Sequence, residues 1–164
     1  MIKQLWAPWR MEYILGAKRL GCLFCKKAKE RSDARNFILY RNEASFVILN
    51  IFPYTYGHLM VAPFRHVRQF SGLNDAELLH FMKAVQVTER ALERALKAQG
   101  FNFGLNIGRV AGAGIKNHIH LHIVPRWNGD TNFMPLFSEV RVLPERLEVT
   151  YKKLIKYFKE KDNE

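Results

Sequence analysis

This chain of 164 residues has only two cysteines, and its sequence contains no long hydrophobic run. Two cysteines cannot form the dense disulfide framework of a small secreted domain. No apolar stretch approaches the roughly 20 residues that a membrane-spanning helix needs. The N-terminus also lacks an uninterrupted apolar segment of the signal-peptide type. We therefore expect a cytoplasmic protein without a membrane span, in which residues 1–164 form a single domain with no internal repeat or linker.

Acidic residues are scarce as well: 15 Asp and Glu stand against 26 Lys and Arg, which gives a formal net charge of +11. Such an excess favours anionic partners, namely nucleotides, polyphosphates or nucleic acid. Charge alone does not choose among them, because many lysines can simply form the solvated faces of helices. The hydrophobic content of 48% is that of a folded globular protein rather than a disordered chain.

Residues 117–126 contain three histidines that alternate with three aliphatic residues: His118, Ile119, His120, Leu121, His122 and Ile123. Successive side chains of a strand point to opposite faces, so the histidines would share one face and the aliphatic residues the other. Same-face neighbours lie roughly 7 Å apart, which lets three imidazoles act on one ligand. The plainest interpretation is a half-buried strand with a polar outer face. Two chemical interpretations compete with it: a metal site, and nucleophilic and electrostatic catalysis on an anionic substrate.

The two cysteines are separated by two residues, as Cys22-Leu23-Phe24-Cys25. In a cytosolic protein, a close pair of this kind is more often a metal or redox site than a structural disulfide. The gap fits half of a tetrahedral zinc site, so two further ligands would have to come from elsewhere in the chain.

The rest of the pattern predicts an α+β fold, in which an antiparallel sheet of about five strands packs with a long helix and a C-terminal helix. Strands are expected at residues 37–41, 46–50, 59–62, 101–108 and 117–126. Residues 74–100 form the clearest helix, because Asn74 and Glu77 suit a capping box and Gly100 suits the helix end. Its buried face is expected to carry Leu78, Met82, Val85, Leu92 and Ala95.

Two terminal segments complete the predicted domain. Residues 1–20 are basic and aromatic, and we expect this N-terminal extension to pack over the core. Residues 143–161 predict the C-terminal helix, with Pro144 in its first turn. The inward face of that helix is expected to contain Leu147, Tyr151, Leu154, Ile155 and Phe158.

Polar and glycine-rich residues cluster before two of the strands. His58 directly follows Gly57 at the start of one strand, and Asn106 lies on the polar face of another. Residues 109–115 form a glycine- and alanine-rich loop that can bring backbone N–H groups close to an anion. Because this loop immediately precedes the three histidines, we prefer phosphate contact to the alternative of a flexible connection.

The alternating histidines, followed by Ile123, Val124, Pro125, Arg126 and Trp127, resemble the signature of the histidine-triad (HIT) superfamily. The resemblance covers most of the chain, from Leu5 to about Phe133. It is closest to the fragile-histidine-triad branch, and within that to bacterial diadenosine tetraphosphate hydrolases and phosphorylases. The N-terminal residues 5–14 are similar to the extension of that group. A HIT-like fold, a homodimer and a dinucleoside polyphosphate substrate are what the resemblance implies.

The middle histidine, His120, has a histidine on each side, and neutral imidazole is a good nucleophile near pH 7. We therefore assign His120 as the nucleophile, in agreement with the resemblance, which further implies that His122 and His58 bind or polarise phosphate oxygens. The substrate contacts that it implies are Asn50 at the ribose, Asn106 near the scissile phosphate, the loop residues Gly112, Ala113 and Gly114, and Trp127.

The resemblance also implies a ligand set for zinc. In zinc-bearing family members the first triad histidine joins two cysteines and one further histidine, which here gives Cys22, Cys25, His66 and His118. Two sulfurs and two nitrogens make a closed tetrahedral set, so the zinc would be structural. We expect no organic cofactor, and Mg²⁺ only as a companion of the nucleotide substrate.

The leading functional prediction is a hydrolase that cleaves dinucleoside polyphosphates through a nucleotidyl-histidine intermediate on His120. A diadenosine tetraphosphate phosphorylase, which uses inorganic phosphate instead of water, is the close alternative. Trp127 after Pro-Arg resembles the phosphorylases, whereas Ala113-Gly114 stands where some of them have Gly-Ser. Two other classes stay open: a metalloenzyme with three histidine ligands, and a non-catalytic zinc module that binds nucleotides or nucleic acid. Nucleic acid is the less expected partner.

Overall fold

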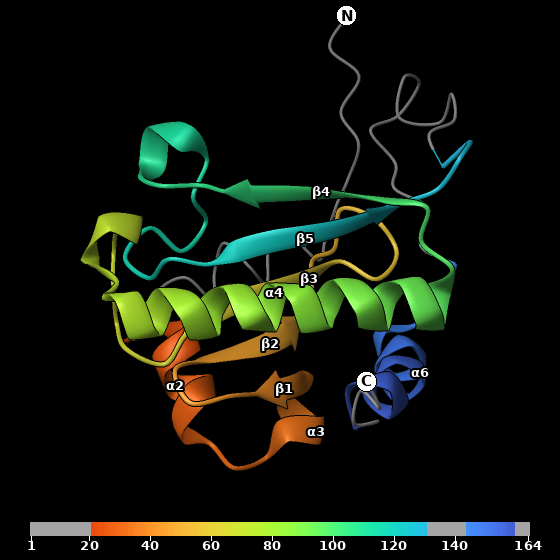
Figure 1. The fold of residues 1–164 in the computed structure, drawn as a ribbon, viewed down its shortest axis with the longest axis horizontal. Coiled ribbons are helices and arrows are strands. Elements are labelled where there is room, and N and C mark those ends of the chain that lie inside the picture. Colours follow the sequence, from red (N-terminus) through yellow and green to blue (C-terminus); the bar gives the residue numbers. More distant parts are fainter. Residues whose placement is uncertain (1–20, 131–143, 160–164) are drawn as a thin grey trace, which may run out of the picture.

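An antiparallel five-stranded sheet forms the centre of the computed structural model, which describes residues 21–130 and 144–159 (Figure 1). The strands follow the order β1-β2-β3-β5-β4 across the sheet. This architecture confirms the predicted HIT-like α+β fold, whereas the aromatic extension 1–20 lies outside the described residues. The strand bounds are β1 Ile38–Arg41, β2 Ser45–Leu49, β3 Leu59–Pro63, β4 Gly100–Leu105 and β5 Leu121–Arg126.

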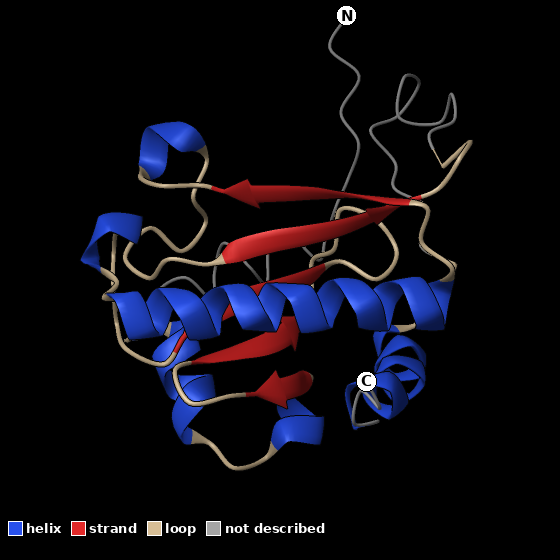
Figure 2. Ribbon diagram, viewed as in Figure 1, coloured by secondary structure: helices blue, strands red, loops and turns tan. Residues whose placement is uncertain are grey.

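Two longer helices pack on one face of the sheet, where α4 lies along the direction of the strands and α6 is beside it (Figure 2). Shorter helices precede β1 and connect the strands. Among residues 21–130 and 144–159, no helix combines the length and the apolar character that crossing a bilayer requires. The helix bounds are α2 Leu23–Lys29, α3 Asp33–Asn36, α4 Asp75–Leu96 and α6 Leu147–Lys159, with 3₁₀ turns at Phe70–Gly72 and Arg109–Ala111.

Helix α4 begins where the sequence predicts. The Asn74 side chain accepts a hydrogen bond from the backbone N–H of Glu77, and the Glu77 carboxylate accepts one from the N–H of Asn74. The helix ends at Leu96 rather than near Gly100, because Lys97 takes a left-handed conformation with φ 55° and Gly100 already belongs to β4.

The predicted buried face of α4 was wrong at Met82, which is 46% exposed. Phe81 is fully buried instead, and a helical rotation of about 100° per residue turns Met82 away from it. The bulky phenyl ring thus decides the inward face, which consists of Phe81, Ala84, Val85, Thr88, Ala91 and Leu92.

Helix α6 begins later than predicted. Pro144 precedes the first helical residue, Leu147, and therefore does not occupy the first turn. The predicted inward residues of this helix are confirmed, since all of them belong to the core that α6 shares with α4 and the sheet: Leu147, Tyr151, Leu154, Ile155 and Phe158.

The two faces of the sheet bury different sets of side chains. Val61, Leu121 and Ile123 belong to the core beneath α4 and α6. Met60 packs with Phe24 of α2 on the opposite face, in a second cluster. His122 pairs with Met60 across the β3–β5 ladder, and alternation puts it on that second face. The sheet therefore separates the histidine side from the main helical layer.

Arg41 of β1 connects α2 to the sheet through hydrogen bonds. Its guanidinium forms a bidentate ion pair with Asp33 and donates hydrogen bonds to the carbonyl oxygens of Ala28, Lys27 and Glu30. These carbonyls stand at the C-terminal end of α2, where intrahelical partners are lacking. The contacts hold α2, and the cysteines at its start, against β1.

Candidate functional site

The histidine stretch is not one continuous strand, which corrects the prediction for residues 117–126. Only His122 lies within β5, because the ladder with β3 reaches no further than Val61 opposite Leu121. Before β5 the chain follows another path, in which the N–H of Ile119 bonds to the Val67 carbonyl at 2.7 Å. The three histidines consequently do not act on one common point.

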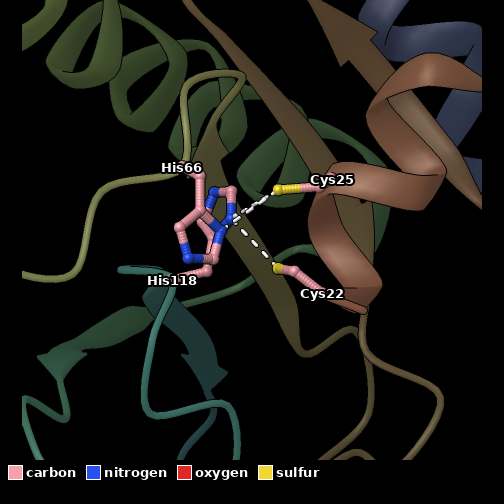
Figure 3. Close-up of side chains that lie close together, drawn as sticks. All are labelled: Cys22, Cys25, His66 and His118. Carbon is pink, nitrogen blue, oxygen red and sulfur yellow. Dashed lines mark hydrogen bonds between the residues drawn. The ribbon is translucent and has the colours of Figure 1, made fainter. Parts of the chain in front are cut away.

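His118 joins a cluster with Cys22, Cys25 and His66, as Figure 3 shows. The Nδ1 atom of His118 lies 3.2 Å from the Cys22 sulfur and 3.5 Å from the Cys25 sulfur. The Nδ1 atom of His66 lies 3.2 Å from the Cys25 sulfur. All four potential ligand atoms lie within 4.8 Å of one another, so the structure brings together the four residues of the predicted metal site.

The chemistry of this cluster fits zinc. Zinc–ligand bonds of about 2.0–2.3 Å in a tetrahedron put ligand atoms roughly 3.3–3.8 Å apart, close to the distances between these side chains. The Nε2 atom of His118 is 2.9 Å from the Pro63 carbonyl, which can only accept, so Nδ1 keeps its lone pair for a metal. Burial lowers the pKa of His118 to about 4, which keeps the imidazole neutral.

His120 is 4% exposed and has its protonation pattern set by the backbone. Its Nδ1 atom lies 2.9 Å from the carbonyl oxygen of His118 and must donate the hydrogen bond. In the neutral ring the lone pair is then on Nε2. Burial lowers the pKa of His120, which favours this neutral form at pH 7. The result is a buried imidazole with an unprotonated nitrogen, as a nucleophile needs.

His58 and His122 form a pair beside His120. The Nδ1 atom of His58 accepts a hydrogen bond from the Tyr54 backbone N–H at 3.0 Å, so its proton is on Nε2. That Nε2–H points to Nδ1 of His122 at 2.9 Å, which in turn puts the His122 proton on Nε2. The His122 ring centroid is 4.9 Å from that of His120. Burial, and after it the repulsion that a protonated His120 would exert, lowers the pKa of His122 to about 4.

The loop before His58 is held by Asn50. The side-chain Oδ1 atom of Asn50 accepts a hydrogen bond from the Phe52 N–H at 2.9 Å, and its Nδ2 atom lies 3.3 Å from Nδ1 of His58. Asn50 is 8% exposed, and these contacts engage its side chain within the loop. The structure thus supports a role for Asn50 in orienting His58, while its contact with a ribose stays a prediction.

Gly57 has φ +72°, and an added Cβ would lie 2.5 Å from the end of the Leu96 side chain and 3.3 Å from Pro125. Because the backbone strain adds to this crowding, we expect Gly57→Ala to lower the free energy of unfolding by about 1–3 kcal/mol and to weaken catalysis by shifting His58. Urea denaturation and steady-state kinetics would measure both. Gly100→Ala is the matched control, because no atom lies within 4 Å of its added Cβ. Equal stability of the two variants would contradict the expectation.

The predicted phosphate-binding loop, residues 109–115, follows a strand end that lies next to His120. Leu105 pairs with Leu121, so Asn106 and His120 are the next residues on adjoining chain segments. A Cβ on Gly112, which has φ +81°, would lie 3.8 Å from the Asn106 amide nitrogen. The loop therefore folds back over Asn106, with Gly112 and Gly114 exposed and Ala113 half-buried. Its contact with phosphate stays a prediction.

Trp127 follows the last residue of β5, whereas His122 lies near the start of that strand. Its indole N–H donates to the Leu96 carbonyl at 3.1 Å, and its ring stacks on Tyr56 with centroids 6.0 Å apart. The Tyr56 hydroxyl bonds to Glu145 and accepts from Lys153 at 2.8 Å. These contacts describe packing between the His58 loop and α6, and a substrate contact of Trp127 remains a prediction.

Sequence reasoning missed two contributors to the site. Phe24 is fully buried between the cysteines, and its ring centroid lies 4.9 Å from that of His120. The ring centroid of Tyr54 lies 4.6 Å from that of His58. The place of Phe24 inside the cysteine motif was the available signal, whereas nothing in the sequence pattern pointed to Tyr54.

The family profile described as the HIT domain matches residues 31–129 of this chain. The chain belongs to the HIT family. The matched region contains His66 and all three triad histidines, whereas both cysteines precede it.

Several HIT relatives are similar over long stretches. The AP-4-A phosphorylase of Mycobacterium tuberculosis is 35% identical over 157 residues, which cover 91% of this chain and 80% of that protein. The asymmetrical bis(5'-nucleosyl)-tetraphosphatase of Schizosaccharomyces pombe is 31% identical over 68% of this chain and 57% of its own length. A crystal structure of a Zn-bound histidine triad family protein from Mycobacterium smegmatis superimposes with a TM-score of 0.68 at 31% identity, covering 85% of this chain and 94% of that one.

Proposed function

We propose that this HIT protein cleaves dinucleoside polyphosphates such as diadenosine tetraphosphate by transferring a nucleotidyl group to His120. The observation that carries the proposal is the hydrogen bond from His120 Nδ1 to the His118 carbonyl, because it leaves Nε2 with a lone pair. The relatives support the substrate class, since both named enzymes act on such nucleotides by their names.

In the first step, the lone pair of His120 Nε2 attacks a phosphorus atom of the anhydride. An N–P bond forms, the P–O bond to the rest of the polyphosphate breaks, and the leaving phosphate takes that electron pair. In the second step, an oxygen of water or inorganic phosphate attacks the same phosphorus. This releases His120 and a nucleotide, and the attacking group gives up its proton.

His122 and His58 assist by supplying donors. The protonation pattern of the pair leaves His122 with an N–H at Nε2, which can bond to a phosphate oxygen. His58 orients that ring, and the Tyr54 N–H orients His58. Preorganised donors of this kind typically contribute about 3–4 kcal/mol to a transition state that develops negative charge. Asn106 and the 109–115 loop are the proposed further contacts of the phosphate chain.

The metal ligands are Cys22, Cys25, His66 and His118 in this proposal. A metal bound there would supply structural stabilisation, because four protein ligands leave no open position for a substrate. Two sulfurs in the set argue against a catalytic metal held by the three triad histidines. The Zn-bound relative from Mycobacterium smegmatis supports zinc as the metal.

The acceptor of the nucleotidyl group divides hydrolysis from phosphorolysis. Hydrolysis is the prediction from the sequence, on the ground that Ala113-Gly114 lacks a serine hydroxyl. The longer match to the phosphorylase from Mycobacterium tuberculosis favours phosphate as the alternative acceptor. Both reactions share the His120 intermediate, so the described site serves either of them.

Product analysis decides between the two acceptors. Purified protein would be incubated with diadenosine tetraphosphate, with and without inorganic phosphate, and the nucleotides separated by chromatography. We expect AMP and ATP in both samples if water is the acceptor. ADP and ATP, formed only when phosphate is present, would indicate phosphorolysis. The absence of turnover in either sample would contradict the proposed function and favour a nucleotide- or nucleic-acid-binding module.

A homodimer and a Mg²⁺-bound substrate are part of the same proposal. Strand β4 stands at the edge of the described sheet, and its Phe103 is 46% exposed and stacks on Phe101. An exposed edge strand with apolar residues supports pairing with a second copy into one continuous sheet. Mg²⁺ would accompany the phosphates rather than a protein site. Residence in the cytoplasm stays a prediction from the sequence.

A further inference from the structure

Phe24 touches both halves of the site. Its side chain is fully buried, and its ring centroid lies 5.2 Å from the ring of His118, a metal ligand, and 4.9 Å from the ring of His120. Phe46 supports it from the sheet with an edge-on contact at 6.2 Å. The segment that carries both cysteines therefore also packs against the His120 ring.

Of the two residues between the cysteines, only Phe24 is directed into the interior. Leu23 shares the gap between the cysteines with Phe24, yet its side chain is 42% exposed. Only one of the two intervening side chains reaches the interior. Because Cys22 precedes α2 and Cys25 lies in its first turn, the direction of Phe24 depends on how the start of that helix is held.

His118 provides a second connection between the cysteines and His120. Its Nδ1 atom faces the two sulfurs, its Nε2 atom donates to the Pro63 carbonyl, and its own carbonyl oxygen accepts from His120 Nδ1. His118 thus joins the cysteines, through its ring, to the His120 proton, through its carbonyl oxygen. Figure 3 shows that His118 and His66 face the cysteines from two other segments of the chain.

We propose that Phe24 is a positioning residue that, together with the His118 carbonyl, couples metal binding at the cysteines to the orientation of His120. The proposal rests on the proposed function only in so far as His120 is the nucleophile. A metal held by Cys22, Cys25 and His118 would fix the start of α2, and with it the Phe24 ring against His120. Without the metal, the ring and the carbonyl lose their common anchor, and the His120 Nδ1–H becomes accessible to exchange.

The test reads the His120 ring directly. The full chain, labelled with ¹⁵N-histidine and loaded with zinc, would be studied by NMR correlations between ring nitrogens and protons, with His120→Ala identifying the signal. We expect a slowly exchanging Nδ1–H in the zinc-loaded protein. Phe24→Leu should accelerate its exchange by roughly 10-fold or more, and lower kcat by roughly 10- to 100-fold with little change in KM.

Phe81→Leu is the matched control, because Phe81 is also fully buried but belongs to α4 and packs in the other core. It should cost stability and leave the His120 signal and kcat unchanged. Removal of zinc from the unsubstituted protein tests the same coupling without any substitution. Its His120 signal should change in the same direction as in Phe24→Leu.

Two results would overturn the coupling. One is a Phe24→Leu protein that loses stability like Phe81→Leu but keeps the His120 signal and kcat. The other is a zinc-free protein with an unaltered His120 signal. Failure of the proposed function is separately visible, since a protein that cleaves no dinucleoside polyphosphate would still report the state of the His120 ring.

Discussion

His120→Ala is expected to lower kcat for diadenosine tetraphosphate by roughly 10⁴-fold or more, because the covalent route loses its nucleophile. His120 Nε2 carries the lone pair, since Nδ1 is occupied by the His118 carbonyl. His122 cannot replace it, because its Nδ1 accepts from His58 and its Nε2 carries a proton. Steady-state kinetics would measure the loss, and calorimetry with the same nucleotide should show that binding is retained.

His80→Ala is the control for this experiment. His80 lies on α4, on the far side of the sheet from His120, where its ring is 3.2 Å from the Glu43 carboxylate. Its replacement should leave kcat unchanged. A His120→Ala protein with more than about a tenth of the original kcat would rule out a nucleotidyl-His120 intermediate, since a lost nucleophile costs far more.

Removal of the metal is expected to lower the melting temperature strongly. A ligand present at 1,000 times its dissociation constant stabilises the folded state by about 4 kcal/mol. At roughly 2–4 °C per kcal/mol for a chain of this size, this predicts a shift of about 8–16 °C. Calorimetric scans of the zinc-loaded protein, with and without a strong chelator, would measure it.

The double variant Cys22→Ser, Cys25→Ser provides the control for metal removal. It lacks both sulfur ligands, so chelator should leave its melting temperature unchanged. Burial and the neighbouring Cys22 sulfur raise the pKa of Cys25. A bound cation would reverse that effect by stabilising the thiolate. Identical melting temperatures of the zinc-loaded protein with and without chelator would contradict a structural metal at this site.

Local sequence patterns predicted those parts of the fold that depend on interactions between residues close together in the sequence. The capping box at Asn74 and Glu77 placed the start of α4, because both partners lie within one helical turn. Alternation separated His122 from Leu121 and Ile123 correctly, because these residues lie in a regular strand. The strand itself was predicted too long, because a bond from the Ile119 N–H to the distant Val67 carbonyl replaces the ladder at the preceding residues.

The candidate site also has features that could be predicted from the sequence and features that could not. The resemblance to a family supplied the ligand set, which spacing alone could not, because Cys22 and His118 are 96 residues apart. The orientation of His58 by the Tyr54 N–H depends on a backbone direction that no pattern encodes. Trp127 illustrates the opposite case, since its motif suggested a substrate contact and its described partners are Leu96 and Tyr56.

The position of the metal ligands along the chain has a consequence for its topology. The contacts of Arg41 join residues only 8 to 14 positions apart. A metal shared by Cys22 and His118 would instead close a loop of 96 residues, and one shared by Cys25 and His66 a loop of 41. Closing long loops removes entropy mainly from the unfolded ensemble. The metal would therefore act as a cross-link that ties α2 to the start of β5, with the four strands β1 to β4 on the chain between them.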